Sequence, residues 1–292
     1  MRSRNKYRLA WGRYQLDLGQ RTLVMGVLNV TPDSFSDGGK FFEYETAVAQ
    51  GEKLAADGAD IIDIGGESTR PFSDAVPVEE EIRRVVPVIE QLAERVKVPI
   101  SIDTMKASVA RRAIEAGATI INDVTALRFD PELAGLAAEL DVPVILMHML
   151  GDPKTMQKDP AYDDLIAEIL EFLADAVDRA TAAGIRRSNI IVDPGIGFGK
   201  TLEHNLLLIK HLHAFSTLQV PVLIGSSRKA FIRKLLKDEN VPDISADLPT
   251  VDTGTQATVA ASILNGAHIV RVHDVAKTVA TARIVDSILG VE

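Results

Sequence analysis

The feature of this sequence that most restricts its fold is a repeated alternation of short apolar runs with amphipathic stretches. Each run is rich in β-branched residues and has the length of a buried strand, and each stretch that follows it is long enough for a helix. Eight such units occur along the chain. Strands that alternate with helices form parallel sheets, and eight units favour a closed (β/α)8 TIM barrel over an open doubly wound sheet.

The positions of the strands follow from the apolar runs. We expect the eight strands at residues 23–29, 60–66, 100–103, 120–124, 143–148, 190–195, 222–226 and 268–273, with helices that include 78–95, 165–183, 253–264 and 276–289. Residues 1–22 precede the first strand and are predicted to cap the bottom of the barrel. The Asp- and Pro-rich residues 237–251 predict an exposed loop. A chain of 292 residues fits one such barrel, so residues 1–292 are interpreted as a single domain.

Composition excludes several classes of function. The net charge of -9 and the pI near 5.3 argue against nucleic acid and anionic membranes as partners. No apolar run approaches the roughly 20 residues of a membrane helix, and none of signal-peptide length follows the basic start, so we expect a cytoplasmic protein. The absence of cysteine excludes disulfides, thiolate nucleophiles and sulfur-based zinc sites. Any metal must therefore be bound by oxygen or imidazole.

Polar side chains end every predicted strand. They are Asn29, Asp63 with Glu67, Asp103, Asn122 with Asp123, His148, Asp193, Ser226 to Lys229, and Arg271 with His273. Active sites of (β/α)8 barrels lie at the carboxyl ends of the strands. Each residue alone is explained as a helix cap or turn residue. A shared polar ligand explains the full set better, because an unpaired carboxylate within an apolar run is costly.

A glycine-rich stretch follows the sixth strand, with the sequence DPGIGFGK at residues 193–200. It lacks both the Walker and the Rossmann spacing, so it does not predict a nucleotide-binding loop. We interpret it as a turn that lets the backbone approach a ligand closely, with Asp193 as the specific contact.

Several motifs together resemble the dihydropteroate synthase family. The most specific are GVLNVTPDSFSDGG at residues 26–39 and DIGGESTRP at residues 63–71. They are followed in order by SIDT at 101–104, INDV at 121–124, DPGIGFGKT at 193–201, SRK at 227–229 and RVHD at 271–274. The resemblance runs from the first strand to the eighth, and only the leading residues and the 237–251 stretch lie outside it.

The resemblance implies a transferase of folate biosynthesis that joins p-aminobenzoate to a dihydropterin activated as its pyrophosphate ester. It implies a pterin site made of Asp103, Asn122, Asp193, Lys229 and Arg271, with the Arg271 guanidinium stacked on the pterin ring. Carboxylates are suited to this role because a pterin presents a 2-amino group beside a ring N–H, which one carboxylate accepts in bidentate fashion.

The resemblance also implies two further subsites. The pyrophosphate is expected at Asn29, Thr69, Arg70, Arg271 and His273, with Mg²⁺ bridging it through one protein contact from Asn29. The p-aminobenzoate site maps to Phe35, Thr69, Arg70, Pro71 and Phe198.

Two positions depart from the family pattern. Ala230 stands where many members have a serine that helps to hold the p-aminobenzoate carboxylate, and Phe72 stands where the second signature usually continues with glycine.

The expected mechanism is ionisation followed by attack of the amine. Mg²⁺, Arg70, Arg271 and His273 stabilise the departing pyrophosphate, and Asp103 supports the positive charge left on the pterin. Asn29, Asp103, Lys229 and Arg271 are thus predicted catalytic residues together with Arg70 and His273. The loops after the first two strands are expected to close over the pterin substrate, so that p-aminobenzoate binds second.

Two alternatives remain open, a pterin-dependent methyltransferase that acts with a corrinoid protein and a non-catalytic paralogue. The methyltransferases have no use for the loops at residues 29–39 and 68–71, and a silent paralogue would be expected to have lost Arg70, Arg271 or His273. The resemblance further predicts a homodimer formed through the late helices.

Overall fold

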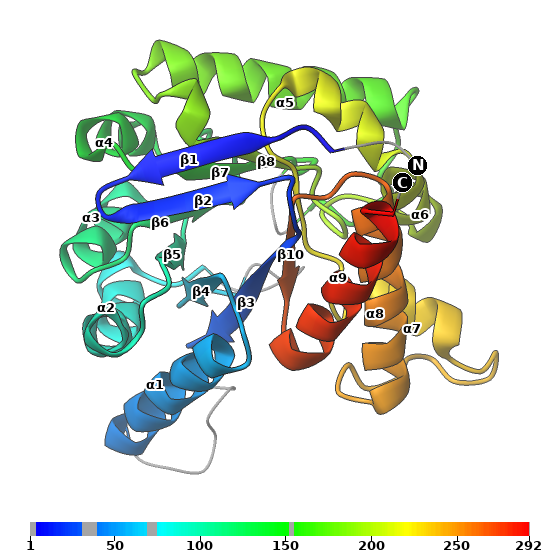
Figure 1. Ribbon diagram of the computed structural model, residues 1–292, viewed down its shortest axis with the longest axis horizontal. Coiled ribbons are helices and arrows are strands. Elements are labelled where there is room, and N and C mark those ends of the chain that lie inside the picture. Colours follow the sequence, from blue (N-terminus) through cyan, green and yellow to red (C-terminus); the bar gives the residue numbers. More distant parts are fainter. Residues whose placement is uncertain (1–3, 31–39, 69–74, 152–154, 292) are drawn as a thin grey trace.

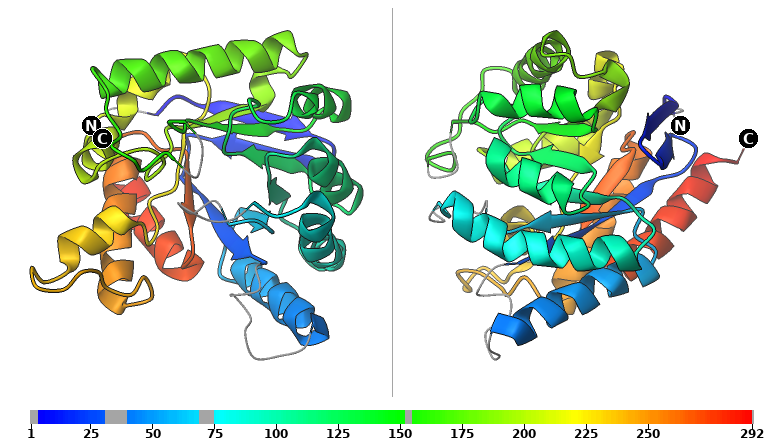
Figure 2. Two further views of the ribbon diagram at one scale, coloured as in Figure 1. Left: turned by 180° about the vertical axis from the view of Figure 1, so that it is seen from behind. Right: turned by 90° about the vertical axis from the view of Figure 1, so that its left-hand side faces the viewer.

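A computed structural model of the chain describes residues 4–30, 40–68, 75–151 and 155–291, except for the side chains of residues 40–43. Within these residues, eight parallel strands form a barrel with helices around it, and an antiparallel hairpin precedes the barrel (Figures 1 and 2). The predicted (β/α)8 barrel is therefore confirmed.

Each barrel strand lies within its predicted range. The strands are β3 (Leu23–Asn29), β4 (Ile61–Gly65), β5 (Ile100–Asp103), β6 (Ile120–Asp123), β7 (Val144–Met147), β8 (Ile190–Asp193), β9 (Leu223–Ile224) and β10 (Ile269–Val272). Consecutive strands from β3 to β8 pair in parallel, and β10 pairs with both β3 and β9. A parallel bridge between Val192 and Val222 links β8 to the start of β9 and closes the barrel.

The helices cover the outside of the barrel, as the two views of Figure 2 show. They are α1 (Lys40–Ala56), α2 (Val78–Arg95), α3 (Ala107–Glu115), α4 (Glu132–Leu140), α5 (Leu165–Ala182), α6 (Leu202–Lys210), α7 (Ala230–Leu236), α8 (Pro249–Leu264) and α9 (Val275–Leu289). Short 3-10 helices occupy Arg187–Asn189 and Leu212–Leu218. Because helices cover the outer face and side chains fill the inside, β4 to β8 are buried along their whole length.

The prediction of an exposed loop at 237–251 is wrong at its carboxyl end. Helix α8 begins there at Pro249, four residues before the predicted helix start at residue 253. Proline is favoured at the first position of a helix, since its missing N–H has no partner there and its φ is already helical. The Asp- and Pro-rich composition therefore marked a helix start as well as a loop.

The bottom of the barrel is closed by the hairpin of β1 (Tyr7–Trp11) and β2 (Tyr14–Leu18). Its inward side chains form one apolar cluster with the residues at the amino ends of the barrel strands. The cluster contains Leu9, Trp11, Leu16, Leu18, Leu23, Met25, Ile61, Ile120, Ile145, Ile191, Leu223 and Ile269. The prediction that the leading residues cap the bottom of the barrel is confirmed.

Two contacts attach the chain's start to its last helix. Arg4 Nη2 pairs with Asp286 Oδ1 of α9 at 2.5 Å, and the Thr22 N–H donates to the other Asp286 oxygen at 2.6 Å. In the described parts of the chain, none of the helices combines the length and apolar character needed to cross a membrane.

Candidate active site

Four polar side chains from the carboxyl halves of β4, β5, β6 and β10 meet at the mouth of the barrel. Arg271 on β10 donates from Nε to Asp63 Oδ2 at 2.6 Å and from Nη2 to Asp103 Oδ2 at 2.8 Å. Asn122 Nδ2 on β6 donates to the same Asp63 oxygen at 3.0 Å. Asp63 on β4 therefore orients both Arg271 and Asn122. The sequence shows it among the polar strand ends, yet no role was predicted for it, because its partner Arg271 lies 208 positions away.

This network leaves acceptor capacity unused. Within the described residues, the Oδ1 atoms of Asp63 and Asp103 are buried without a hydrogen-bond partner. Burial raises the pKa of Asp103 to about 7; the positive charge of Arg271 opposes that rise, and the negative charge of Asp63 adds to it. A buried acceptor without a donor is costly, so its persistence at this position suits a ligand that brings a donor.

A second group is formed by Asp193 at the end of β8 and Lys229 after β9. Burial raises the pKa of Asp193, and the positive charge of Lys229 opposes that rise. Burial lowers the pKa of Lys229 to about 8. Lys229 donates to the Ile196 carbonyl, and its Nζ lies 4.5 Å from the centre of the Phe198 ring. Arg271 lies on β10, which pairs with β9, and the chain runs from β9 into Lys229, so the two groups are adjacent at the mouth of the barrel.

The glycine-rich turn after β8 is shaped by its contacts. The Gly195 N–H donates to Asp193 Oδ1 at 2.7 Å, and Gly195 adopts a φ of +73°. A side chain at Gly195 would meet the His148 carbonyl oxygen at 1.9 Å, so only glycine fits. The turn fixes one Asp193 oxygen and presents Phe198 beside Lys229.

Lys200 and His148 form a buried pair that sequence reasoning missed. Lys200 Nζ lies 2.8 Å from His148 Nδ1 and donates to the Phe198 carbonyl at 2.9 Å. Burial lowers the pKa of Lys200 well below its usual value, and burial lowers the pKa of His148 to about 2. The neutral ring packs edge-on against Phe172. The pair ties the turn after β8 to the end of β7.

The remaining predicted site residues fall into two groups. His273 is half-buried, and its Nδ1 lies 2.9 Å from the Ser227 hydroxyl, while the exposed Asn29 ends β3. The predicted contacts Phe35, Thr69, Arg70 and Pro71, together with the departure at Phe72, lie outside the described residues. Among the residues that are described, no cluster of three or more Asp, Glu or His side chains is arranged to hold a metal ion.

Two strand-end residues have structural roles. Asp123 accepts hydrogen bonds from the Thr125 N–H, the Thr125 hydroxyl and the Leu127 N–H at 2.6 to 2.8 Å. Arg228 adopts a φ of +59° and pairs with Asp252 and Asp247. For these two residues, the turn and packing roles account for the polar side chain.

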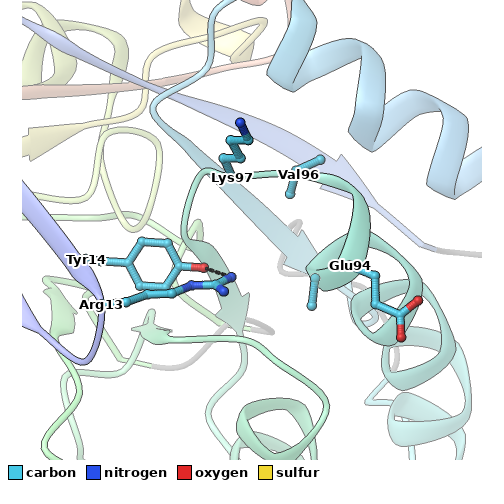
Figure 3. A pocket seen from close by; sticks show the side chains of 6 residues that line it. Arg13, Tyr14, Glu94, Val96 and Lys97 are labelled. Atoms are coloured by element: carbon cyan, nitrogen blue, oxygen red, sulfur yellow. Dashed lines mark hydrogen bonds between the residues drawn. The ribbon is translucent and has the colours of Figure 1, made fainter.

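A surface cavity near the bottom of the barrel does not compete with this site. It has a volume of about 380 Å³, lies beside the β1–β2 hairpin and is lined by Arg13, Tyr14, Ala93, Glu94, Val96 and Lys97. Figure 3 shows Arg13 bonded to the Tyr14 hydroxyl, while the Glu94 and Lys97 side chains point away from one another. These charged groups do not converge on a common point, so they do not form a binding site.

Comparison with known proteins agrees with this geometry. The family model described as "Pterin binding enzyme" matches residues 25–273, which run from the first barrel strand to the last. The chain belongs to this family. The matched region contains all the strand-end residues described above.

Individual relatives are similar over nearly the whole chain. A dihydropteroate synthase of Synechocystis sp. is 45% identical over 277 residues, which cover 95% of this chain and 93% of that protein. The structure of a Xanthomonas albilineans dihydropteroate synthase with 4-aminobenzoic acid has a TM-score of 0.88 and 44% identity, covering 99% of this chain and all of the other. A Yersinia pestis dihydropteroate synthase with a sulfonamide drug complex has a TM-score of 0.88 and 43% identity, with coverage of 98% and 100%.

Proposed function

We propose that this pterin-binding enzyme is a dihydropteroate synthase, a transferase that joins 6-hydroxymethyl-7,8-dihydropterin pyrophosphate to p-aminobenzoate and releases pyrophosphate. The observation that carries the proposal is the buried Asp103 carboxylate, whose Oδ1 lacks a partner among the described residues beside the Arg271 guanidinium. The identity with synthases over nearly the full chain supports the same reaction.

The pterin is proposed to bind across the two groups of strand-end residues. Its 2-amino group and ring N–H donate to Asp193, and Asp103 and Asn122 bind the opposite edge of the ring system. Lys229 donates to the ring carbonyl. Two ion pairs with carboxylates hold the Arg271 guanidinium, and a guanidinium held in this way forms a stable platform for a heteroaromatic ring.

The chemical step is proposed to be loss of pyrophosphate followed by attack of the neutral arylamine. Arg271 and His273 face the leaving group together with Asn29, Thr69 and Arg70, and their charges and donors favour departure of the anion. The ionised Asp103 favours the cation that forms on the pterin. The arylamine is already nucleophilic, so alignment of the two substrates supplies the remaining acceleration without a strong base.

The residues at the mouth fit Mg²⁺ bound mainly through the substrate. Asn29 is exposed at the end of β3 and offers one amide oxygen, which suits an ion that keeps several waters and takes few protein ligands. When bound, Mg²⁺ would neutralise part of the pyrophosphate charge. Removal of divalent cations with a chelator is expected to abolish product formation, and added Mg²⁺ to restore it.

The p-aminobenzoate pocket is proposed to include Phe198 with Phe35, Thr69, Arg70 and Pro71. We infer an ordered reaction, in which the pyrophosphate draws the loops after β3 and β4 inward before the second substrate binds. Calorimetry tests this order. A sulfonamide should bind detectably only when pterin and pyrophosphate are present with Mg²⁺, and tight binding to the empty enzyme would contradict the ordered reaction.

One assay separates the proposed function from its alternatives. Purified protein with both substrates and Mg²⁺ should release pyrophosphate in step with formation of dihydropteroate. A corrinoid-dependent methyltransferase or a silent paralogue would bind pterin but release no pyrophosphate. Pterin binding without turnover under these conditions would therefore overturn the synthase proposal.

A homodimer formed through the late helices is also proposed. Helices α6 to α9 gather on one side of the barrel (Figure 1), and exposed apolar side chains lie on these helices. They include Leu206, Leu207, Leu235, Leu236, Leu264, Ile284 and Ile288. Sedimentation should give twice the chain mass of 31.6 kDa, and Ile284→Glu, at a side chain that is 65% exposed, should shift it toward the monomer.

A further inference from the structure

The hydroxyl of Ser227 contacts His273 at two points. Ser227 Oγ lies 2.9 Å from Nδ1 of the imidazole ring, and it accepts the backbone N–H of the same histidine at 3.3 Å. Ser227 follows β9 and His273 follows β10, and these two strands pair in parallel. The contact therefore joins two neighbouring strand ends at the mouth of the barrel, across 46 positions of the chain.

The surroundings of this hydroxyl direct its hydrogen. A backbone N–H can only donate, so Ser227 Oγ is the acceptor in that bond. Ser227 is only 7% exposed, and among the described residues His273 Nδ1 is the one acceptor within reach of its O–H. A buried hydroxyl that fails to donate loses a hydrogen bond that water would have supplied. The O–H of Ser227 therefore points at Nδ1, which accepts through its lone pair.

This assignment places the ring proton of His273 on the other nitrogen. A neutral imidazole carries one N–H, and the nitrogen that accepts a hydrogen bond cannot also carry the proton. Nε2 is then a donor on the edge of the ring that faces away from Ser227. An anionic oxygen is attracted by a donor and repelled by a lone pair, so this tautomer suits a negatively charged leaving group.

We propose that Ser227 is a positioning residue for the reaction, which holds the His273 ring with its proton on Nε2 so that the neutral imidazole donates to the departing pyrophosphate. The proposal rests on the proposed function, because the contact between His273 and pyrophosphate comes from there. Ser227 acts through His273 alone. Its hydroxyl binds both the backbone N–H and the ring of that residue, so it fixes the orientation of the ring as well as its tautomer.

The first test is the tautomer, read by ¹⁵N NMR of histidine-labelled protein at about pH 8.5, where histidine rings are ordinarily neutral. The chain has six histidines, and the ring signals that vanish in His273→Gln belong to His273. Wild type should show a proton on Nε2 and a hydrogen-bonded Nδ1. In Ser227→Ala, the Nδ1 signal should shift, because its donor is lost. A wild-type proton on Nδ1, or an Nδ1 signal that is unchanged in Ser227→Ala, overturns the proposal.

The second test is kinetic. Ser227→Ala should lower kcat about tenfold, because the Nε2 donor acts on charge that develops as pyrophosphate leaves. Affinity for a pterin without pyrophosphate should stay within about twofold of wild type. Ser227→Thr retains the hydroxyl and should restore most of the lost kcat.

The matched control is Thr258→Val. It removes the 2.9 Å contact between Thr258 and the hydroxyl of the neighbouring Ser226, and it leaves the Ser227 hydroxyl in place. Both kcat and the His273 ring signals should stay at their wild-type values.

The outcomes distinguish the positioning role from the function. A wild-type enzyme that makes no dihydropteroate overturns the proposed function, while its NMR spectrum still tests the tautomer. An active wild type whose Ser227→Ala variant keeps its kcat overturns only the positioning role. A Ser227→Ala variant that loses pterin affinity as strongly as kcat also overturns it, and so does a folded Ser227→Thr variant with the wild-type tautomer but the low kcat of Ser227→Ala.

Discussion

The amino and carboxyl ends of the barrel strands differ in how their side chains are satisfied. At the amino end, Leu9 and Leu18 of the hairpin are 1% and 0% exposed and pack on the first residues of the strands. At the carboxyl end, buried carboxylates crowd around Arg271, and two of their oxygens lack a partner within the described residues. The amino ends of the strands therefore contribute to stability, and their carboxyl ends provide groups for binding. Changes at the bottom should lower the free energy of unfolding, and changes at the mouth should lower substrate affinity and the reaction rate.

The largest expected effect is on the free energy of unfolding, from a change at the bottom of the barrel. Leu9→Ala should lower the free energy of unfolding by about 3 kcal/mol, because the truncated side chain leaves a cavity under the barrel. Activity per folded molecule should stay at the wild-type level. Denaturant unfolding and an assay well below the melting temperature measure the two quantities. Leu248→Ala, at a residue that is 40% exposed, is the control and should change stability little. Loss of kcat in folded Leu9→Ala would show that the two ends are coupled.

The next largest effect is expected on pterin affinity at the mouth of the barrel. Asp193→Asn should weaken pterin binding by about 2 kcal/mol or more, because one acceptor becomes a donor facing the pterin N–H groups. Isothermal calorimetry with a pterin measures it.

Asp123→Asn is the matched control, because Asp123 accepts its hydrogen bonds from its own turn. It should lower stability and leave pterin affinity unchanged. Wild-type affinity in Asp193→Asn would remove Asp193 from the site.

A smaller effect is expected from pH. Burial raises the pKa of Asp103 to about 7, so this carboxyl becomes protonated below pH 7 and, without its charge, accepts more weakly from a pterin donor. Pterin affinity should then fall by up to about tenfold per pH unit, or about 1.4 kcal/mol. Above pH 8 the affinity should fall again, since burial lowers the pKa of Lys229 to about 8 and its charge is lost there.

Calorimetry across pH 5 to pH 9 measures this profile, and Asp103→Asn should remove its acidic limb. An acidic limb that persists in Asp103→Asn would assign the titration to another group.

The smallest effect concerns Ala230, which is exposed at the start of α7 at a position where the sequence resemblance leads us to expect a serine. Ala230→Ser should lower KM for p-aminobenzoate about threefold, because a hydroxyl adds one hydrogen bond worth about 0.7 kcal/mol to the carboxylate. Ala230→Val adds bulk without a donor and should not lower KM. An equal KM in wild type and Ala230→Ser would show that the hydroxyl finds no partner there.

The sequence by itself determined the barrel and the order of its polar strand ends. The β-branched runs placed all eight strands, because a strand buried on both faces must be continuously apolar. The placement of Asp103, Asn122, Asp193, Lys229 and Arg271 at or just after strand ends also came from the sequence, since parallel strands present their carboxyl ends to one mouth. The start of α8 at Pro249 was missed, because proline has the same local signal in a loop and in a first helical turn.

Only the tertiary structure decided which of these side chains meet. Asp63 accepts from Arg271 across 208 positions, and Lys106, directly before α3, binds Glu67 after β4 and Glu81 of α2. Lys200 and His148 are 52 positions apart and pair only because β7 and β8 are neighbours. Local composition cannot specify such partners, because closure of the barrel sets the distances between strand ends. Burial then decides which charges must be paired, and both depend on the whole chain.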